Sequence, residues 1–158
     1  MRVAFASAKR ESIMGEKLKQ LERWVRSEVP PPPIAQLIGF RLEEIRSGES
    51  LLTLEAGDNH ANPMGTLHGG ILCDIADAAM GLAYAATLAD DESFTTLELK
   101  INFLKPVWKD RLTAKGRVIQ RGKTIGLTEC TVTNSEGDRV AFATSTCMTL
   151  RGEQARGR

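Results

Sequence analysis

The sequence has no excess of charge of either sign. Its 21 lysines and arginines are balanced by 20 aspartates and glutamates, and the formal net charge is +1. A protein dedicated to nucleic acid would carry a basic excess on one face. The balance therefore argues against a nucleic-acid partner.

Cysteine and histidine are scarce. The three cysteines, Cys73, Cys130 and Cys147, are odd in number and lack Cys-x-x-Cys spacing. We interpret them as reduced, mostly buried thiols of a cytoplasmic protein. The two histidines, His60 and His68, have no convincing carboxylate or thiol partners at ligand spacing, so we expect no metal.

Signals for export and membrane insertion are weak. The apolar part of the segment from Met1 to Ala6 is too short for a secretory signal. The longest apolar run, residues 71–88, has the length of a membrane span, but Asp74 and Asp77 lie within it. Each would add about 2.5–3.5 kcal/mol to insertion. We expect a soluble protein without a membrane partner.

The most informative segment runs from Asn62 to Gly70 and reads Asn-Pro-Met-Gly-Thr-Leu-His-Gly-Gly. The apolar run after it is hydrophobic on every face at helical spacing, which is typical of a buried helix. An aspartate inside such a helix is costly unless something satisfies it. The glycines before the helix leave its first N–H groups open to an anion or oxyanion. A buried carboxylate and an open helix N-terminus together indicate a site for attack on a carbonyl group.

With Asp77 nine residues after His68, this segment resembles the hot-dog-fold acyl-CoA thioesterases. It is most similar to the phenylacetate-degradation-type branch of the 4-hydroxybenzoyl-CoA thioesterase superfamily. The resemblance covers about residues 34–150 and continues in Thr96–Pro106, Arg121–Thr124 and Gly137–Met148. It implies hydrolysis of an acyl-CoA thioester to a free acid and CoA. No separate cofactor is implied, because coenzyme A is part of the substrate.

The pattern predicts an α+β hot-dog fold, in which an antiparallel β-sheet wraps around one long central helix. A chain of 158 residues with 42% hydrophobic content is expected to form one domain with a sizeable core. The expected strands are residues 40–45, 50–56, 95–105, 111–121, 123–134 and 138–150. In the third of these, one face is expected to be buried, because Leu97, Leu99, Ile101 and Phe103 alternate with polar residues.

An extra N-terminal helix is expected before the sheet. The apolar residues that recur there at helical spacing are Met14, Leu18, Leu21 and Val25. They predict an amphipathic helix over about residues 7–28, which Pro30–Pro33 end before serving as a stiff linker. The expected organisation is residues 1–33 for this helix and linker, 34–150 for the hot-dog thioesterase domain, and 151–158 for a flexible tail.

Asp77 is the candidate catalytic carboxylate. A desolvated carboxylate can activate a water as a general base, or attack the thioester carbonyl itself as a nucleophile, and the sequence leaves both routes open. The structural alternative is an aspartate satisfied by backbone groups or by a partner subunit. Asp74, about one helical turn earlier, does not match the family's catalytic position, and we interpret it as structural.

The backbone N–H groups of Gly69 and Gly70 are candidate oxyanion donors at the helix N-terminus, because negative charge develops on the thioester oxygen during attack. The resemblance points to the Gly69 N–H in particular. A plain tight turn is the alternative. The resemblance implies three supporting residues. His68 would shape the oxyanion loop, Asn62 would approach the thioester or the attacking water, and Thr96 would orient that water. Asn62 could instead bond only its own turn, and Thr96 could be a plain strand residue.

The turn formed by Arg121, Gly122, Lys123 and Thr124 has two interpretations. By composition it is a polar hairpin turn. In the family that the chain resembles, this turn reaches the nucleotide end of coenzyme A, and two cations beside a glycine suit phosphate contacts. The four residues are therefore candidates for CoA binding.

The spacing of the site residues predicts a partner subunit. Gly69 and Asp77 are eight residues apart on one helix, or about 12 Å along its axis. An oxyanion donor and a nucleophile must both lie about 3 Å from the reacting group. A two-fold homodimer with antiparallel central helices can bring them together, whereas one chain cannot easily do so. The resemblance implies such dimers, often paired into tetramers.

Two other functions are open at this stage. One is a non-catalytic acyl-CoA-binding sensor on the same fold, against which the retained Asp77 argues. The other is a hot-dog hydratase or dehydratase, although those enzymes usually rely on a histidine in a different motif. The acyl group is also open, since Ala78, Gly81 and Leu82 indicate only an apolar pocket.

Overall fold

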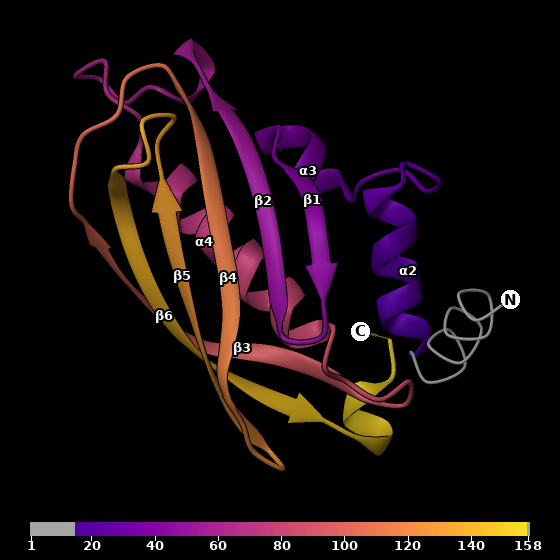
Figure 1. Ribbon diagram of the computed structural model, residues 1–158. Helices are drawn as coiled ribbons and strands as arrows, with labels where there is room; N and C mark the ends of the chain where they lie inside the picture. The colour runs from indigo at the N-terminus through magenta and orange to yellow at the C-terminus, as the bar shows by residue number, and fades with distance from the viewer. Residues whose placement is uncertain (1–14, 158) are drawn as a thin grey trace, which may run out of the picture.

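The computed structural model describes residues 15–157, which form one antiparallel sheet with helices packed against it (Figure 1). The strand order across the sheet is β1-β2-β4-β5-β6-β3. The strands are β1 Arg41–Arg46, β2 Glu49–Ala56, β3 Ser93–Phe103, β4 Asp110–Arg121, β5 Ile125–Thr133 and β6 Arg139–Leu150. Strand β3 therefore lies at one edge of the sheet, next to β6.

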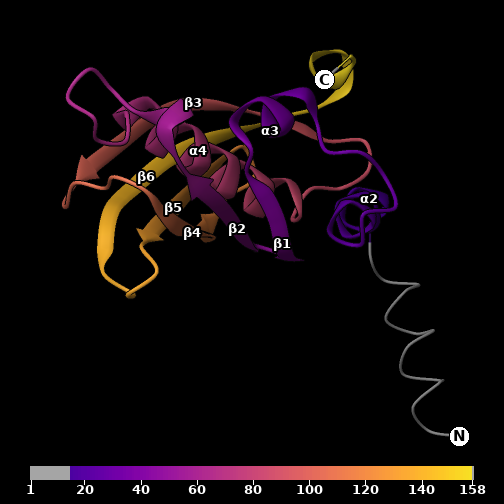
Figure 2. The ribbon, with the colours of Figure 1, turned by 90° about the horizontal axis from the view of Figure 1, so that it is seen from above.

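The sheet curves around helix α4, Gly69–Ala85, as the two views show (Figures 1 and 2). The buried residues of α4 are Leu72, Ile75, Ala76, Ala79, Met80, Ala83 and Tyr84. Strand β4 crosses the helix so closely that a Cβ atom on Gly116 would lie 2.4 Å from the carbonyl oxygen of Ala79. The Ser50 hydroxyl of β2 donates to the same carbonyl at 2.7 Å. This arrangement confirms the predicted hot-dog fold.

Strand β3 departs from its predicted pattern. Its pairing with β6 contains a bulge between Thr96 and Glu98, and Leu97 within that bulge is 51% exposed. One extra residue reverses the alternation of side chains, so Thr96 comes to share the face of Leu99, which packs against the core. Phe103 is 56% exposed. The prediction of one continuous buried face is therefore wrong for Leu97 and Phe103 in the single chain.

Helix α2, Glu16–Val25, lies alongside β1 and is seen end-on in Figure 2. Four of its side chains pack against the core: Leu18, Leu21, Trp24 and Val25. Three of these were expected from the spacing, whereas Trp24 was not. Met14 and the first part of the predicted helix, residues 7–14, lie outside the described residues.

The end of α2 comes earlier than the prolines predicted. Ser27 adopts the left-handed conformation with φ of 58°. Its N–H donates to the carbonyl of Trp24, and the N–H of Glu28 donates to that of Arg23, each at 2.9 Å. These bonds form a Schellman motif. The motif usually carries glycine at this position, and serine gives no such signal in the sequence.

Two shorter helices flank the strands in sequence. Helix α3, Pro33–Ile38, starts on a proline and is closed by Gly39 with φ of 89°. Gly152–Ala155 form a short 3-10 helix inside the expected tail, which the lack of apolar periodicity did not predict. Within residues 15–157, each helix is too short or too polar to cross a membrane.

Candidate active site

An apolar cavity of about 240 Å³ lies between α4, β3 and the N-terminal segment. Ala78, Gly81 and Leu82 line it, as the sequence indicated, together with aromatic rings that include Phe94. Among the described residues around it, Asp77 carries the only ionisable group. The cavity can thus hold an apolar group next to a single carboxylate.

The carboxylate of Asp77 is bonded across to β3. The Thr96 hydroxyl donates a hydrogen bond of 3.3 Å to Asp77 Oδ1. Burial against the apolar walls raises the pKa of Asp77, the Thr96 hydrogen bond lowers it in part, and the nearby charge of Asp74 raises it further, so that the net direction is upward. A raised pKa brings a carboxylate closer to the range in which it acts as a base near neutral pH.

Asp77 is nevertheless exposed to solvent in the single chain. The prediction of a buried carboxylate is therefore wrong for the single chain. The cause is an uncovered face of α4. Ile71, Asp74, Ala78 and Leu82 are only half-buried and recur at helical spacing along this face. The buried residues of α4 lie on its other faces, against the sheet.

The loop before α4 is ordered by its own polar groups. His68 is the N-cap, and its Nδ1 accepts a hydrogen bond of 2.9 Å from the N–H of Gly70. The N–H of Gly69 has no hydrogen-bond partner among residues 15–157. The Phe103 ring lies over Gly69, where a Cβ atom would stand 3.1 Å from its Cζ. Gly69 therefore presents the unpaired donor that an oxyanion needs.

Asn62 bonds its own loop. Its Oδ1 accepts from the N–H groups of Met64, at 2.9 Å, and Thr66, at 3.3 Å. Its Nδ2 donates to the Thr66 hydroxyl at 2.8 Å. In the single chain Asn62 thus bonds its own turn, which was the structural alternative to a role at the thioester. These hydrogen bonds position the loop that carries Gly69.

The chain brings together some predicted site residues and separates others. Asp77 and Thr96 line one cavity. Gly69 borders another hollow, of about 360 Å³, beside Phe103 and Val107. None of the described residues around Gly69 also lines the cavity of Asp77. A single chain thus holds the two halves of the predicted site apart.

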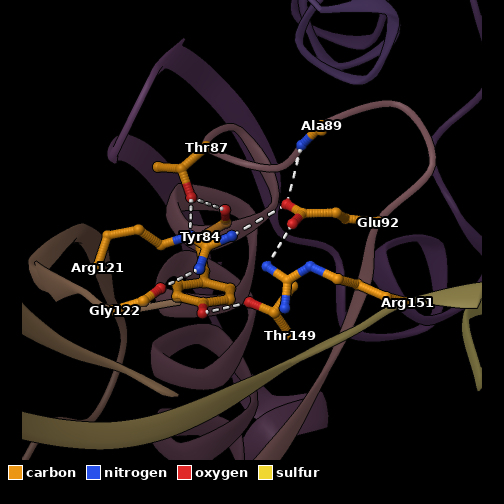
Figure 3. Close-up of polar contacts among 8 residues, drawn as sticks. All are labelled: Tyr84, Thr87, Ala89, Glu92, Arg121, Gly122, Thr149 and Arg151. Carbon is orange, nitrogen blue, oxygen red and sulfur yellow. Dashed lines mark hydrogen bonds and ion pairs between the residues drawn. The ribbon is translucent and has the colours of Figure 1, made fainter. Parts of the chain in front are cut away.

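Arg121, a predicted CoA ligand, takes part in an internal network (Figure 3). Its guanidinium bonds the carboxylate of Glu92 at 3.0 Å, the hydroxyl of Thr87 at 3.2 Å and the carbonyl of Gly122 at 2.6 Å. Its Cζ lies 4.9 Å from the centre of the buried Tyr84 ring. The Arg121 side chain is only 24% exposed.

Glu92 is the centre of this network, and no pattern in the sequence indicated this role. It also accepts hydrogen bonds from Arg151, at 2.5 Å, and from the N–H of Ala89, at 3.1 Å. Burial opposes its ionisation, but these bonds and the two arginine charges hold the pKa of Glu92 below its usual range. Lys123, by contrast, is exposed at the tip of the turn.

Known proteins identify the family. Residues 64–141 match the model of the thioesterase superfamily. A "Putative esterase" of Saccharolobus solfataricus is 30% identical over 118 residues, which cover 75% of this chain and 84% of that protein. The chain belongs to the thioesterase superfamily. The predicted family and enzyme class, a hydrolase of thioesters, are thereby confirmed.

Solved structures agree with this assignment. The thioesterase is 31% identical to a "putative thioesterase, phenylacetic acid degradation-related protein" from Ralstonia eutropha JMP134, with a TM-score of 0.74 and coverage of 81% of this chain and 98% of that one. It is 30% identical to a hypothetical thioesterase protein with coenzyme A from Streptococcus pneumoniae TIGR4. The TM-score there is 0.66, and the match covers 71% of this chain and 86% of that chain.

Proposed function

We propose that this thioesterase hydrolyses acyl-CoA thioesters, with Asp77 as the reacting carboxylate. The observation that carries the proposal is the cavity in which Asp77 and its hydrogen-bond partner Thr96 face otherwise apolar walls. Such a cavity suits an acyl group whose thioester carbon lies beside the carboxylate. The streptococcal relative with coenzyme A supports CoA as the thiol half of the substrate.

Asp77 has one oxygen available for chemistry. Oδ1 accepts from Thr96, whereas Oδ2 accepts no hydrogen bond from residues 15–157. Oδ2 either takes a proton from a water that attacks the thioester, or attacks the carbonyl itself. In the first route the Thr96 oxygen can also accept a hydrogen bond from that water. Label in the Asp77 carboxylate after a single turnover in ¹⁸O-labelled water would identify the nucleophilic route, in which water attacks the aspartyl carbon of the mixed anhydride.

The oxyanion donor comes from a second copy of the chain. The Gly69 N–H is unpaired among the described residues, but about two helical turns separate it from Asp77. The uncovered face of α4 and the edge of β3, where Leu97 and Phe103 are exposed, provide the surface for an antiparallel partner. The partner's Gly69 would then face Asp77, and the family resemblance implies further pairing into tetramers.

The cysteines support a cytoplasmic location. All three are free thiols, and burial raises the pKa of Cys130 to about 12. Unpaired buried thiols are typical of proteins that work in a reducing compartment.

Thiol release from a panel of aryl-, short-chain and long-chain acyl-CoAs tests the proposal. Asp77→Asn should keep the fold and lose about 10²–10⁴-fold in kcat, the usual effect of removing an acid–base group. A variant within about threefold of wild type, with an unchanged melting curve, would sink the assignment of Asp77. Tight binding of acyl-CoA by the wild type without thiol release would instead favour a sensor.

A further inference from the structure

The acyl cavity has one wall from outside the sheet-and-helix core. Trp24, at the end of α2, lines the cavity opposite α4, together with Phe40 just before β1. Trp24 is half-buried, and no residue of α2 is fully buried. This wall is therefore formed by a helix whose side chains are at most half-buried against the edge of the sheet.

A second hollow lies directly behind that wall. A groove of about 600 Å³ runs between the end of α2 and β1, with Val29 and Leu42 among its apolar residues and Glu28, Arg41 and Glu43 at its charged positions. Trp24 and Phe40 line both this groove and the cavity of Asp77. The two rings thus stand between a small chamber and a larger one.

From this arrangement we infer that Trp24 is the specificity-determining residue that limits the length of the acyl group. The inference rests on the proposed function and adds to it a substrate class. Wild-type substrates carry apolar acyl groups, short aliphatic or with a single ring, that end before Trp24. Chains too long for the first chamber meet the indole ring, although the groove beyond has room for them.

Trp24 can be changed more safely than Phe40. Phe40 is 4% exposed and belongs to the core, so its removal would cost stability. Trp24→Ala opens the partition from the side of α2 alone. Trp24→Phe keeps an aromatic contact with the core but removes one ring, and it carries the test if the alanine variant does not fold.

The matched control is Ile34→Ala. Ile34 also lines the cavity of Asp77 but not the groove, and it is 50% exposed. This change widens the first chamber without joining it to the second. Circular dichroism melting curves establish that all variants are folded before their activities are compared.

The measurement is kcat/KM for butyryl-, hexanoyl-, octanoyl-, dodecanoyl- and palmitoyl-CoA. Trp24→Ala should raise the ratio of the dodecanoyl to the butyryl value by at least about tenfold, because the binding of even one methylene in a hydrophobic pocket is worth about 10–200-fold. Trp24→Phe should raise it less, and Ile34→Ala should leave it near the wild-type ratio.

The outcomes distinguish a failure of the role of Trp24 from a failure of the proposed function. If the wild type cleaves these thioesters and folded Trp24 variants keep its chain-length profile, the role of Trp24 is wrong and the proposed function stands. If Ile34→Ala raised the ratio of the dodecanoyl to the butyryl value as much as Trp24→Ala, the role of Trp24 as a partition would also be wrong. If the wild type releases thiol from no acyl-CoA, the proposed function fails and the inference fails with it.

Discussion

The Thr96 hydroxyl donates to Asp77 Oδ1 across a distance of 3.3 Å, from the edge strand to the central helix. Two opposing influences meet at this carboxylate. Burial and the charge of Asp74 raise the pKa of Asp77, and the hydrogen bond from Thr96 lowers it. Changes at the two neighbours should therefore move the pH dependence of catalysis in opposite directions.

Thr96→Val removes the donor that stabilises the charged form of Asp77. The pKa of Asp77 should rise further, so the acidic limb of the kcat/KM profile should move to higher pH. Because kcat/KM reports the ionisations of the free enzyme, a full pH–rate profile is the measurement. Thr96→Ser keeps the hydroxyl, and its acidic limb should lie at the same pH as that of the wild type. An unmoved limb in Thr96→Val would exclude the hydrogen bond as an influence on Asp77.

Asp74→Asn removes the like charge near Asp77. The pKa of Asp77 should fall, and the same limb should move to lower pH while the plateau activity is kept. Loss of the plateau itself would contradict the structural interpretation of Asp74 and give that residue a part in the chemistry.

Mixed dimers test whether each site draws on two chains. Asp77→Asn removes the carboxylate proposed to react, and Asn62→Ala loosens the loop that carries Gly69. If these act from different subunits, a mixed dimer places both lesions in one site and leaves the other intact. Random reassortment makes about half the dimers mixed, so about a quarter of wild-type activity should return on refolding the variants together.

Each variant refolded alone is the control for that experiment. Mass spectrometry should confirm that mixed dimers are present. If they are and activity does not recover, Asp77 and the loop of Gly69 act from the same chain.

Arg121 and Lys123 should differ in their effects, although both lie in the predicted CoA-binding turn. Arg121→Ala removes hydrogen bonds to Glu92, Thr87 and Gly122. A charged hydrogen bond contributes about 1.5–3 kcal/mol, so the variant should melt earlier. Lys123→Ala should instead raise KM for acyl-CoA and weaken its salt dependence, because exposed phosphate contacts are screened by ions.

Acyl-pantetheine, which lacks the nucleotide, is the control substrate. Lys123→Ala should leave its KM unchanged. If KM rises equally with both substrates, or if Arg121→Ala raises KM for acyl-CoA without lowering the melting temperature, the division between the two cations is wrong.

Ser27→Gly should stabilise the protein. A non-glycine residue in the left-handed region costs roughly 1–2 kcal/mol, and part of the gain is offset by the greater freedom of glycine in the unfolded chain. A net gain of about 0.5–1 kcal/mol corresponds to roughly 1–4 °C in Tm at this chain size. Ser27→Ala keeps the Cβ atom and should show no gain. Equal Tm values for all three proteins would contradict strain at Ser27.

Periodic patterns predicted most of the fold. The central helix was readable because its apolar residues recur on every face, and the strands because glycine and polar turns separate alternating segments. The motif from Asn62 to Gly70 located the loop before the helix in the same way. These features depend on residues close together in the sequence, so they can be predicted from the sequence alone.

Features set by contacts distant in sequence escaped prediction. The bulge at Leu97 exists only in the pairing of β3 with β6, and it moved Thr96 onto the face of Asp77. Glu92 matters because two distant arginines converge on it. Trp24 lines the cavity of Asp77 because α2 packs beside β1. None of these partners can be named from local spacing.

The strand order also sets when the site can assemble during synthesis. Strand β3 is made before β4, β5 and β6, yet among the described strands it pairs only with β6, Arg139–Leu150. Thr96 therefore gains its place opposite Asp77 only after the last strand has left the ribosome. Until then the nascent chain carries an unpaired strand with exposed apolar residues, a state prone to aggregation and suited to chaperone binding.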